Sequence, residues 1–100
     1  MTTEYFVICR LRTAGGFEAY GNFSLGGDCD FATELFGKLR GCHLPRETDS
    51  LHLDLVESRN GIPTNLQVIS CTADEIAANC KVITKEMFKR LNLEQESRAG

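Results

Sequence analysis

The clearest pattern of apolar and polar positions lies in residues 51–70, LHLDLVESRNGIPTNLQVIS, where the two alternate on both sides of Asn60-Gly61. An Asn-Gly pair between alternating segments is typical of a β-hairpin with a two-residue turn. Counting outward from that turn pairs Arg59 with Ile62, and then Leu55 with Leu66, Leu53 with Val68, and Leu51 with Ser70. One face of this hairpin is nearly all apolar, so we expect it to line the core.

A second hairpin is predicted near the N-terminus, where EYFVICRLRT and FEAYGNFSL flank Ala14-Gly15-Gly16. A two-residue turn would mix apolar and polar residues on both faces. A three-residue loop with Gly in the left-handed conformation separates them better. The pairs expected from that loop are Leu11–Ala19, Arg10–Tyr20, Cys9–Gly21, Val7–Phe23 and Tyr5–Leu25.

Each predicted hairpin is followed by a helical pattern. The first helix follows Asp28-Cys29-Asp30, either of whose acids can cap it, and Gly41 is its expected stop. The second opens with Thr72-Ala-Asp-Glu75, a capping box. The apolar positions that recur at helical spacing are Phe31, Leu35, Phe36 and Leu39 in the first helix, and Ile76, Cys80, Ile83, Met87 and Leu91 in the second.

The element order ββαββα predicts one α+β domain over residues 1–93, followed by a flexible C-terminal tail over residues 94–100. We expect a two-layer sandwich, with a four-stranded sheet and both helices on one of its faces. This connectivity is that of a circularly permuted ferredoxin-like fold. The rule for right-handed crossovers then places the second and fourth strands side by side and parallel at the centre.

The sheet face turned away from the helices is less polar than a solvated face should be. The alternation assigns the odd positions of the first three strands and the even positions of the fourth to the core. An apolar patch rimmed by charge remains on the other face, and such patches often mark an interface. The interface candidates are Phe6, Ile8, Arg10, Tyr20, His52, Val56 and Ile69.

Composition and charge exclude several classes of function. The net charge is −3 and no concentrated basic face is evident, so nucleic-acid binding is unlikely. The longest strongly apolar run, Phe6 to Cys9, is too short to span a membrane, and the N-terminus lacks the features of a signal peptide. Five cysteines without a Cys-x-x-Cys pair indicate reduced thiols and a cytoplasmic protein.

No catalytic residue, metal site or cofactor site is predicted. Cys42 and His43 are sequence neighbours, which does not supply the convergent geometry of a Cys-His nucleophile. Asp28-x-Asp30 resembles the start of a calcium loop but lacks the later ligands. The same two acids oppose a reactive thiolate at Cys29.

The loop over residues 41–50, GCHLPRETDS, is the longest connection and carries a second set of candidates, namely Cys42, His43 and Arg46. Loops of this composition can bind small ligands, although a plain crossover explains the segment more simply. The sequence therefore predicts a non-enzymatic module that acts through protein contacts, most simply as a homodimer or other homo-oligomer. The alternative is a small-ligand-binding regulatory domain.

Overall fold

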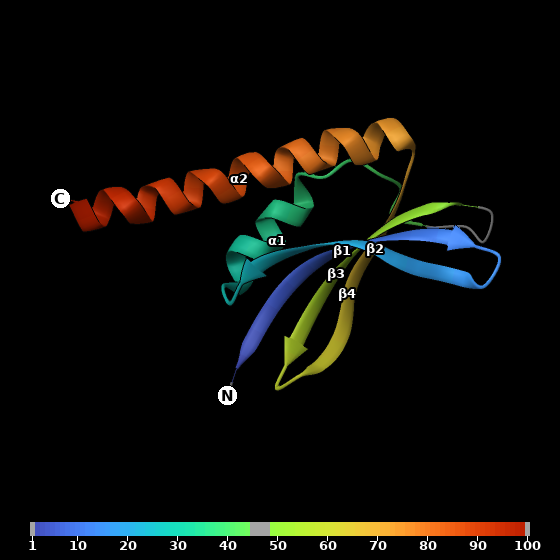
Figure 1. The fold of residues 1–100 in the computed structure, drawn as a ribbon, viewed down its shortest axis with the longest axis horizontal. Helices are drawn as coiled ribbons and strands as arrows, with labels where there is room; N and C mark the ends of the chain where they lie inside the picture. Colours follow the sequence, from blue (N-terminus) through green and yellow to red (C-terminus); the bar gives the residue numbers. More distant parts are fainter. Residues whose placement is uncertain (1, 45–48, 100) are drawn as a thin grey trace.

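The fold is a four-stranded antiparallel sheet with two helices, as the α+β prediction required (Figure 1). The computed structural model describes residues 2–44 and 49–99, with side chains through residue 91. The elements in chain order are β1 (Thr3–Thr13), β2 (Gly16–Gly26), α1 (Cys29–Gly37), β3 (Leu51–Arg59), β4 (Ile62–Cys71) and α2 (Ala73–Ala99). Both helices contribute side chains to one core on the same side of the sheet, and α2 extends well beyond the sheet edge.

The strand order is β2-β1-β3-β4, with β1 and β3 antiparallel at the centre. The prediction that β2 and β4 lie parallel at the centre, as in a permuted ferredoxin-like sheet, is therefore wrong. The strands β2 and β3, which the α1 segment joins, do run parallel to each other, but β1 lies between them, so the crossover passes over one strand and β2 stays at the edge. Strand β3, at the centre, has four successive buried residues, 53–56, whereas β2, with its glycines, and β4, with Pro63, have compositions suited to the edges.

The β3–β4 hairpin has the predicted turn but not the predicted register beyond it. Arg59 pairs with Ile62, and Asn60 and Gly61 have positive φ angles of 54° and 83°, as a two-residue turn of this type requires. A β-bulge at Leu66 then shifts the ladder by one residue. The observed pairs beyond it are Leu55–Gln67, Leu53–Ile69 and Leu51–Cys71.

This bulge reverses the faces of β4, because a shift of one residue moves every side chain to the other side of a strand. Ile69 is fully buried in the core beneath the helices, and Cys71 joins it there. Val68 takes a place on the opposite face, beside Asp54. The assignment of Ile69 to the uncovered face is therefore wrong.

The β1–β2 hairpin keeps only part of the predicted register. The expected partners of Leu11, Arg10 and Tyr5 are wrong, because these residues pair with Glu18, Ala19 and Gly26. Thr13 pairs with Gly16 across a two-residue turn, instead of the predicted three-residue loop. A bulge at Tyr20 restores the predicted pairs Cys9–Gly21 and Val7–Phe23. The extra residue that we placed in the turn is thus accommodated within the strand.

Tyr20 consequently lies on the helix side of the sheet, and its assignment to the uncovered face is wrong. The pKa of its hydroxyl is raised first by burial and then by Cys9, Cys80 and Cys71. Cys9 and Cys71 both belong to the core beneath the helices. A bulge places two successive residues on one side, so Tyr20 shares the core side with Gly21.

Both helices begin at predicted caps. Asp28 Oδ1 accepts a hydrogen bond from the Phe31 amide at 3.2 Å. Thr72 and Glu75 exchange the two hydrogen bonds of a capping box, at 2.9 and 3.1 Å. Helix α1 ends at Gly37, earlier than the predicted stop at Gly41, while α2 continues through the segment predicted as a tail. That segment, residues 94–99, is rich in good helix formers and contains no Gly or Pro.

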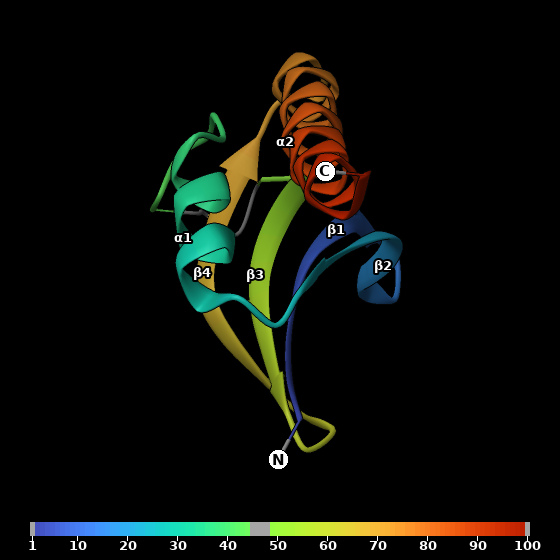
Figure 2. The same ribbon diagram turned by 90° about the vertical axis from the view of Figure 1, so that its left-hand side faces the viewer.

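The chain after α1 is attached to the edge of β4 and to α2. The Cys42 amide and carbonyl bond the carbonyl and amide of Ser70, at 2.8 and 2.9 Å. The buried Asn79 side chain of α2 bonds both the amide and the carbonyl of Arg40, each at 2.8 Å. A Cβ at Gly41 would lie 2.8 Å from the Ser70 carbonyl oxygen, so this close approach depends on glycine. Figure 2 shows α1 and α2 side by side over the curved sheet.

Candidate functional site

The sheet face turned away from both helices, which we call the open face, carries five of the seven predicted interface residues. These are Phe6, Ile8, Arg10, His52 and Val56, all on the central strands β1 and β3. The ladder pairs Phe6 with Val56, Ile8 with Asp54, and Arg10 with His52. Side chains directly opposite each other in an antiparallel pair lie on the same face, so these residues form one continuous surface.

The apolar part of the open face lies in the middle of the sheet. Val56 is only 3% exposed although no helix covers it, and Phe6, Ile8 and Val68 are half-buried. Neighbouring side chains on the same face provide this shielding. A solvated sheet face normally presents a polar row at such positions.

A charged pair is fixed in the same region. Arg10 Nε donates a hydrogen bond to Asp54 Oδ2 at 2.6 Å, and Asn65 Nδ2 donates a longer one to the same oxygen at 3.4 Å. The Asp54 side chain is 4% exposed, whereas that of Arg10 is 31% exposed. The other carboxylate oxygen, Asp54 Oδ1, is buried and has no hydrogen-bond partner among the described residues.

His52 extends the polar region toward the β1–β2 hairpin. Its ring stacks on Phe17 with a centroid separation of 4.3 Å and an interplanar angle of 20°. The Arg12 guanidinium lies 5.4 Å from the Phe17 ring centroid. His52 Nε2 is buried, and within the described part of the chain nothing bonds to it.

Sequence reasoning missed Phe17 and Asn65 on this face. The register counted from the Asn-Gly turn did place Asn65 opposite Val56, as observed, but Asn65 was not named as an interface candidate. The three-residue loop placed Phe17 opposite Thr13, whereas it lies opposite Arg12. Phe17 could have been assigned to this face only if the β1–β2 hairpin had been predicted with a two-residue turn.

A second polar cluster joins β1, β3 and the start of α1. The Tyr5 hydroxyl donates a hydrogen bond to Glu57 Oε2 at 2.8 Å, and Glu57 Oε1 lies 3.3 Å from Arg59. The pKa of Tyr5 is raised first by its hydrogen bond with Cys29 and then by that with Glu57. This cluster therefore links β1, β3 and the start of α1.

The candidate ligand loop is described only in part, because residues 45–48 lie outside the described residues. Cys42 pairs with β4, and its thiol donates to the Leu44 carbonyl at 3.5 Å. His43 is exposed, and Arg46 lies outside the described residues. The start of this segment is thus an anchored edge of the sheet.

The five cysteines are dispersed and unpaired, in accordance with the prediction of free thiols. Burial raises the pKa of Cys9 and of Cys71 to about 11, whereas Cys29 and Cys42 are exposed at the two ends of the α1 segment. Among the side chains described, those of residues 2–44 and 49–91, no group of three or more His, Cys, Asp or Glu could hold a metal ion.

Comparisons with known proteins give no family: no family model matches this chain, and no curated protein or solved structure matches it. Among the helices described here, none is long and apolar enough to cross a membrane. The open face is therefore characterised by its own geometry alone.

Proposed function

We propose that this protein is a non-enzymatic module that self-associates through its open face. The observation that supports this proposal is the apolar centre of a sheet face that neither helix covers, with the Arg10–Asp54 ion pair beside it. We further propose that the module works in the cytoplasm, because five unpaired thiols suit a reducing compartment.

The apolar residues support an interface because they are contiguous. Phe6 and Val56 are cross-strand partners, and Ile8 lies one step along β1 on the same face. Aromatic and aliphatic side chains at the centre of a patch, with polar side chains around them, are the usual arrangement of an interface. Burying Phe6 and Ile8 against a second copy would remove apolar surface from water.

The polar residues support self-association in particular. A two-fold interface places the same surface on both subunits, so each donor on one copy needs an acceptor on the other. The open face contains both kinds: Arg12 is an exposed donor, and the exposed side-chain amides of Asn22 and Asn65 carry oxygens that can accept. Arginine is also among the residues that contribute most to binding at interfaces.

Sedimentation equilibrium tests this proposal on the wild type and on two open-face variants, Phe6→Glu and Asn22→Glu. Asn22 is exposed and pairs with Ile8, so the second variant adds charge to the face without removing a packed side chain. We expect the wild type to form dimers or higher oligomers, and both variants to shift the equilibrium toward the monomer by at least about tenfold.

Phe88→Glu is the matched control, because Phe88 is an exposed aromatic residue of α2 on the other side of the molecule. This variant should associate like the wild type. A wild type that stays monomeric at high concentration, or variants that all associate equally, would overturn the proposal.

A further inference from the structure

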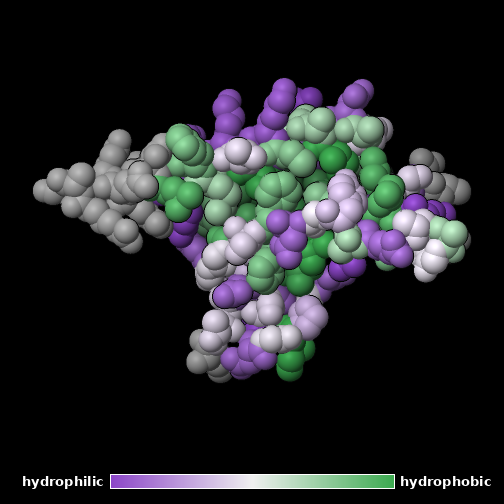
Figure 3. Space-filling view, in the orientation of Figure 1, coloured by the Kyte–Doolittle hydropathy of each residue, from purple (hydrophilic) through white to green (hydrophobic). Residues whose placement is uncertain are grey.

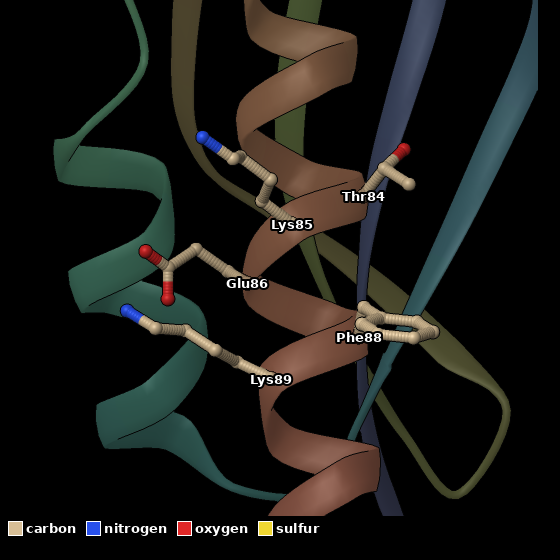
Figure 4. A pocket seen from close by; sticks show the side chains of 5 residues that line it. All are labelled: Thr84, Lys85, Glu86, Phe88 and Lys89. Atoms are coloured by element: carbon tan, nitrogen blue, oxygen red, sulfur yellow. The ribbon is translucent and has the colours of Figure 1, made fainter.

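Helix α2 has a groove on its outer surface that contributes nothing to the core. One part, about 510 Å³ in volume, is lined by Thr84, Lys85, Glu86, Phe88 and Lys89. The adjoining part, of about 450 Å³, is lined by Cys80, Lys81, Thr84 and Lys85. The two parts share Thr84 and Lys85, so they form one continuous outer groove. In Figure 4 the strands lie behind α2, and the lining side chains point away from them or to either side of the helix.

One side of the outer groove is apolar. Phe88 is 64% exposed, and Leu91, one turn further along, is 53% exposed. The Thr84 hydroxyl donates its one proton to the Cys80 carbonyl at 2.8 Å, within the helix. Hydrophobic surface is also visible below α2 in the space-filling view, under a row of hydrophilic side chains (Figure 3).

The other side of the outer groove is basic. Lys81, Lys85 and Lys89 recur every four residues and therefore lie along one side of the helix. The carboxylate on this stretch, Glu86, is drawn toward α1, where Lys38 Nζ lies 2.8 Å from its Oε1. The pKa of Glu86 is lowered first by that hydrogen bond and then by the charges of Lys38, Lys89 and Lys85.

Glu86 lies near enough to Lys85 and Lys89 to feel their charges, but its ion pair is with Lys38. In the described residues, none of Lys81, Lys85 and Lys89 has a carboxylate within ion-pair distance. The chain as a whole carries a net charge of −3, so this basic row is a local departure from the overall charge.

We propose that the outer groove binds an acidic amphipathic helix of another protein. The partner's apolar side chains would pack against Phe88 and Thr84, and its carboxylates would meet the three lysines. Because the lysines are spaced by one helical turn, a helix lying along α2 can present carboxylates at the same interval. The apolar strip is narrow, which suits a helix better than a bilayer, whose binding requires a broad apolar face.

A designed peptide tests this inference by fluorescence anisotropy on the full chain. The probe is a labelled helical peptide of about 18 residues, which is about five helical turns. It carries leucines at i, i+3, i+4 and i+7 spacing and glutamates beside them. The control peptide has the same leucines with lysines replacing the glutamates. We expect the acidic peptide to bind, the basic peptide to bind at least about tenfold more weakly, and binding to fall as salt rises.

Two variants of the chain locate the binding. A triple variant, Lys81→Glu, Lys85→Glu and Lys89→Glu, changes only exposed positions and should weaken binding of the acidic peptide at least about tenfold. Asn22→Glu, on the open face, should leave that binding unchanged, which separates this inference from the proposed self-association. Equal binding of both peptides, no loss in the triple variant, or binding of anionic phospholipid vesicles in place of the acidic peptide would overturn it.

Discussion

Asp54 is a nearly buried carboxylate on a sheet face that no helix covers. Arg10 and Asn65 bond one of its oxygens, and the other has no partner among the described residues. A buried charge of this kind depends on its ion-pair partner, because its own desolvation is costly. The pair thus contributes to the folded state as well as to the open face.

Replacing Arg10 by methionine should therefore destabilise the fold. Loss of the guanidinium leaves the Asp54 carboxylate buried without its cation, and we expect a loss of about 1–3 kcal/mol in the free energy of unfolding. Urea denaturation measures this loss. Arg12→Met is the control, since Arg12 lies on the same strand face and is exposed; equal effects of the two substitutions would contradict the role of the pair.

The cysteines give a second prediction at the residue scale. At pH 8 a disulfide-exchange reagent should modify Cys29 and Cys42 first, because both are exposed. Cys9 and Cys71, whose pKa values are raised to about 11 by burial, should react only after unfolding. Mass spectrometry of the modified chain identifies the sites, and rapid labelling of Cys9 or Cys71 in the native protein would contradict the observed packing.

Individual site residues were predictable where a single alternation was unbroken. On β1 and β3 the pattern placed Phe6, Ile8, Arg10, His52 and Val56 correctly on the open face. It failed for Tyr20 and Ile69, because each lies at or beyond a bulge. The position of a bulge depends on which register packs the whole core better. The local alternation of apolar and polar residues does not contain that information.

At the level of elements, the segment after α1 is held to β4 by a close backbone approach at Gly41. Alanine there would place its Cβ 2.8 Å from the Ser70 carbonyl oxygen and 3.0 Å from the Cys71 thiol. We expect Gly41→Ala to destabilise the protein by about 1–3 kcal/mol in urea denaturation.

Gly37→Ala provides the matched control for this substitution. Gly37 is the last residue of α1, its φ is not positive, and nothing lies within 4 Å of a Cβ built on it. Alanine at this position should be neutral or slightly stabilising. If Gly41→Ala proved as mild as Gly37→Ala, the attachment of this segment to β4 would be wrong.

The cap of α1 predicts a pH dependence. The pKa of Asp28 is lowered first by the hydrogen bond from the Phe31 amide, with a further contribution from Arg90 at 3.2 Å. Because the folded pKa lies below the unfolded value, the stabilisation is complete above the unfolded pKa of about 3.9 and is lost as pH falls through the folded pKa.

Asp28→Asn isolates this contribution, because asparagine still caps but does not titrate. We expect the wild type to have the higher Tm at neutral pH, and the difference to shrink as the pH is lowered toward about 2. Thermal unfolding followed by circular dichroism measures both. A difference that is independent of pH would contradict the lowered pKa.

The elements themselves were predictable from the sequence, whereas their assembly was not. The Asn60-Gly61 turn, the Asp28 cap and the capping box at Thr72 are local signals, and the structure confirms all three. Strand order is a non-local property, decided by which strands gain most from burial at the centre. The crossover rule that we applied to it fixes the hand of a connection between parallel strands, and not how many strands lie between them.

At the scale of the whole molecule, the open face and the outer groove of α2 lie on opposite sides. The open face is built on the two central strands, which the hydrogen-bonded ladder holds in a fixed arrangement. The outer groove belongs to one long helix that projects beyond the sheet (Figure 1). A molecule arranged in this way can associate with itself through one side and bind a different partner through the other.

A concentration series of amide spectra recorded by NMR tests the central claim, self-association through the open face, most directly. Between about 10 μM and about 1 mM, we expect concentration-dependent shifts at Phe6, Ile8 and Val56 and constant shifts at Thr84 and Phe88. Spectra that do not change with concentration, or changes confined to α2, would contradict the claim.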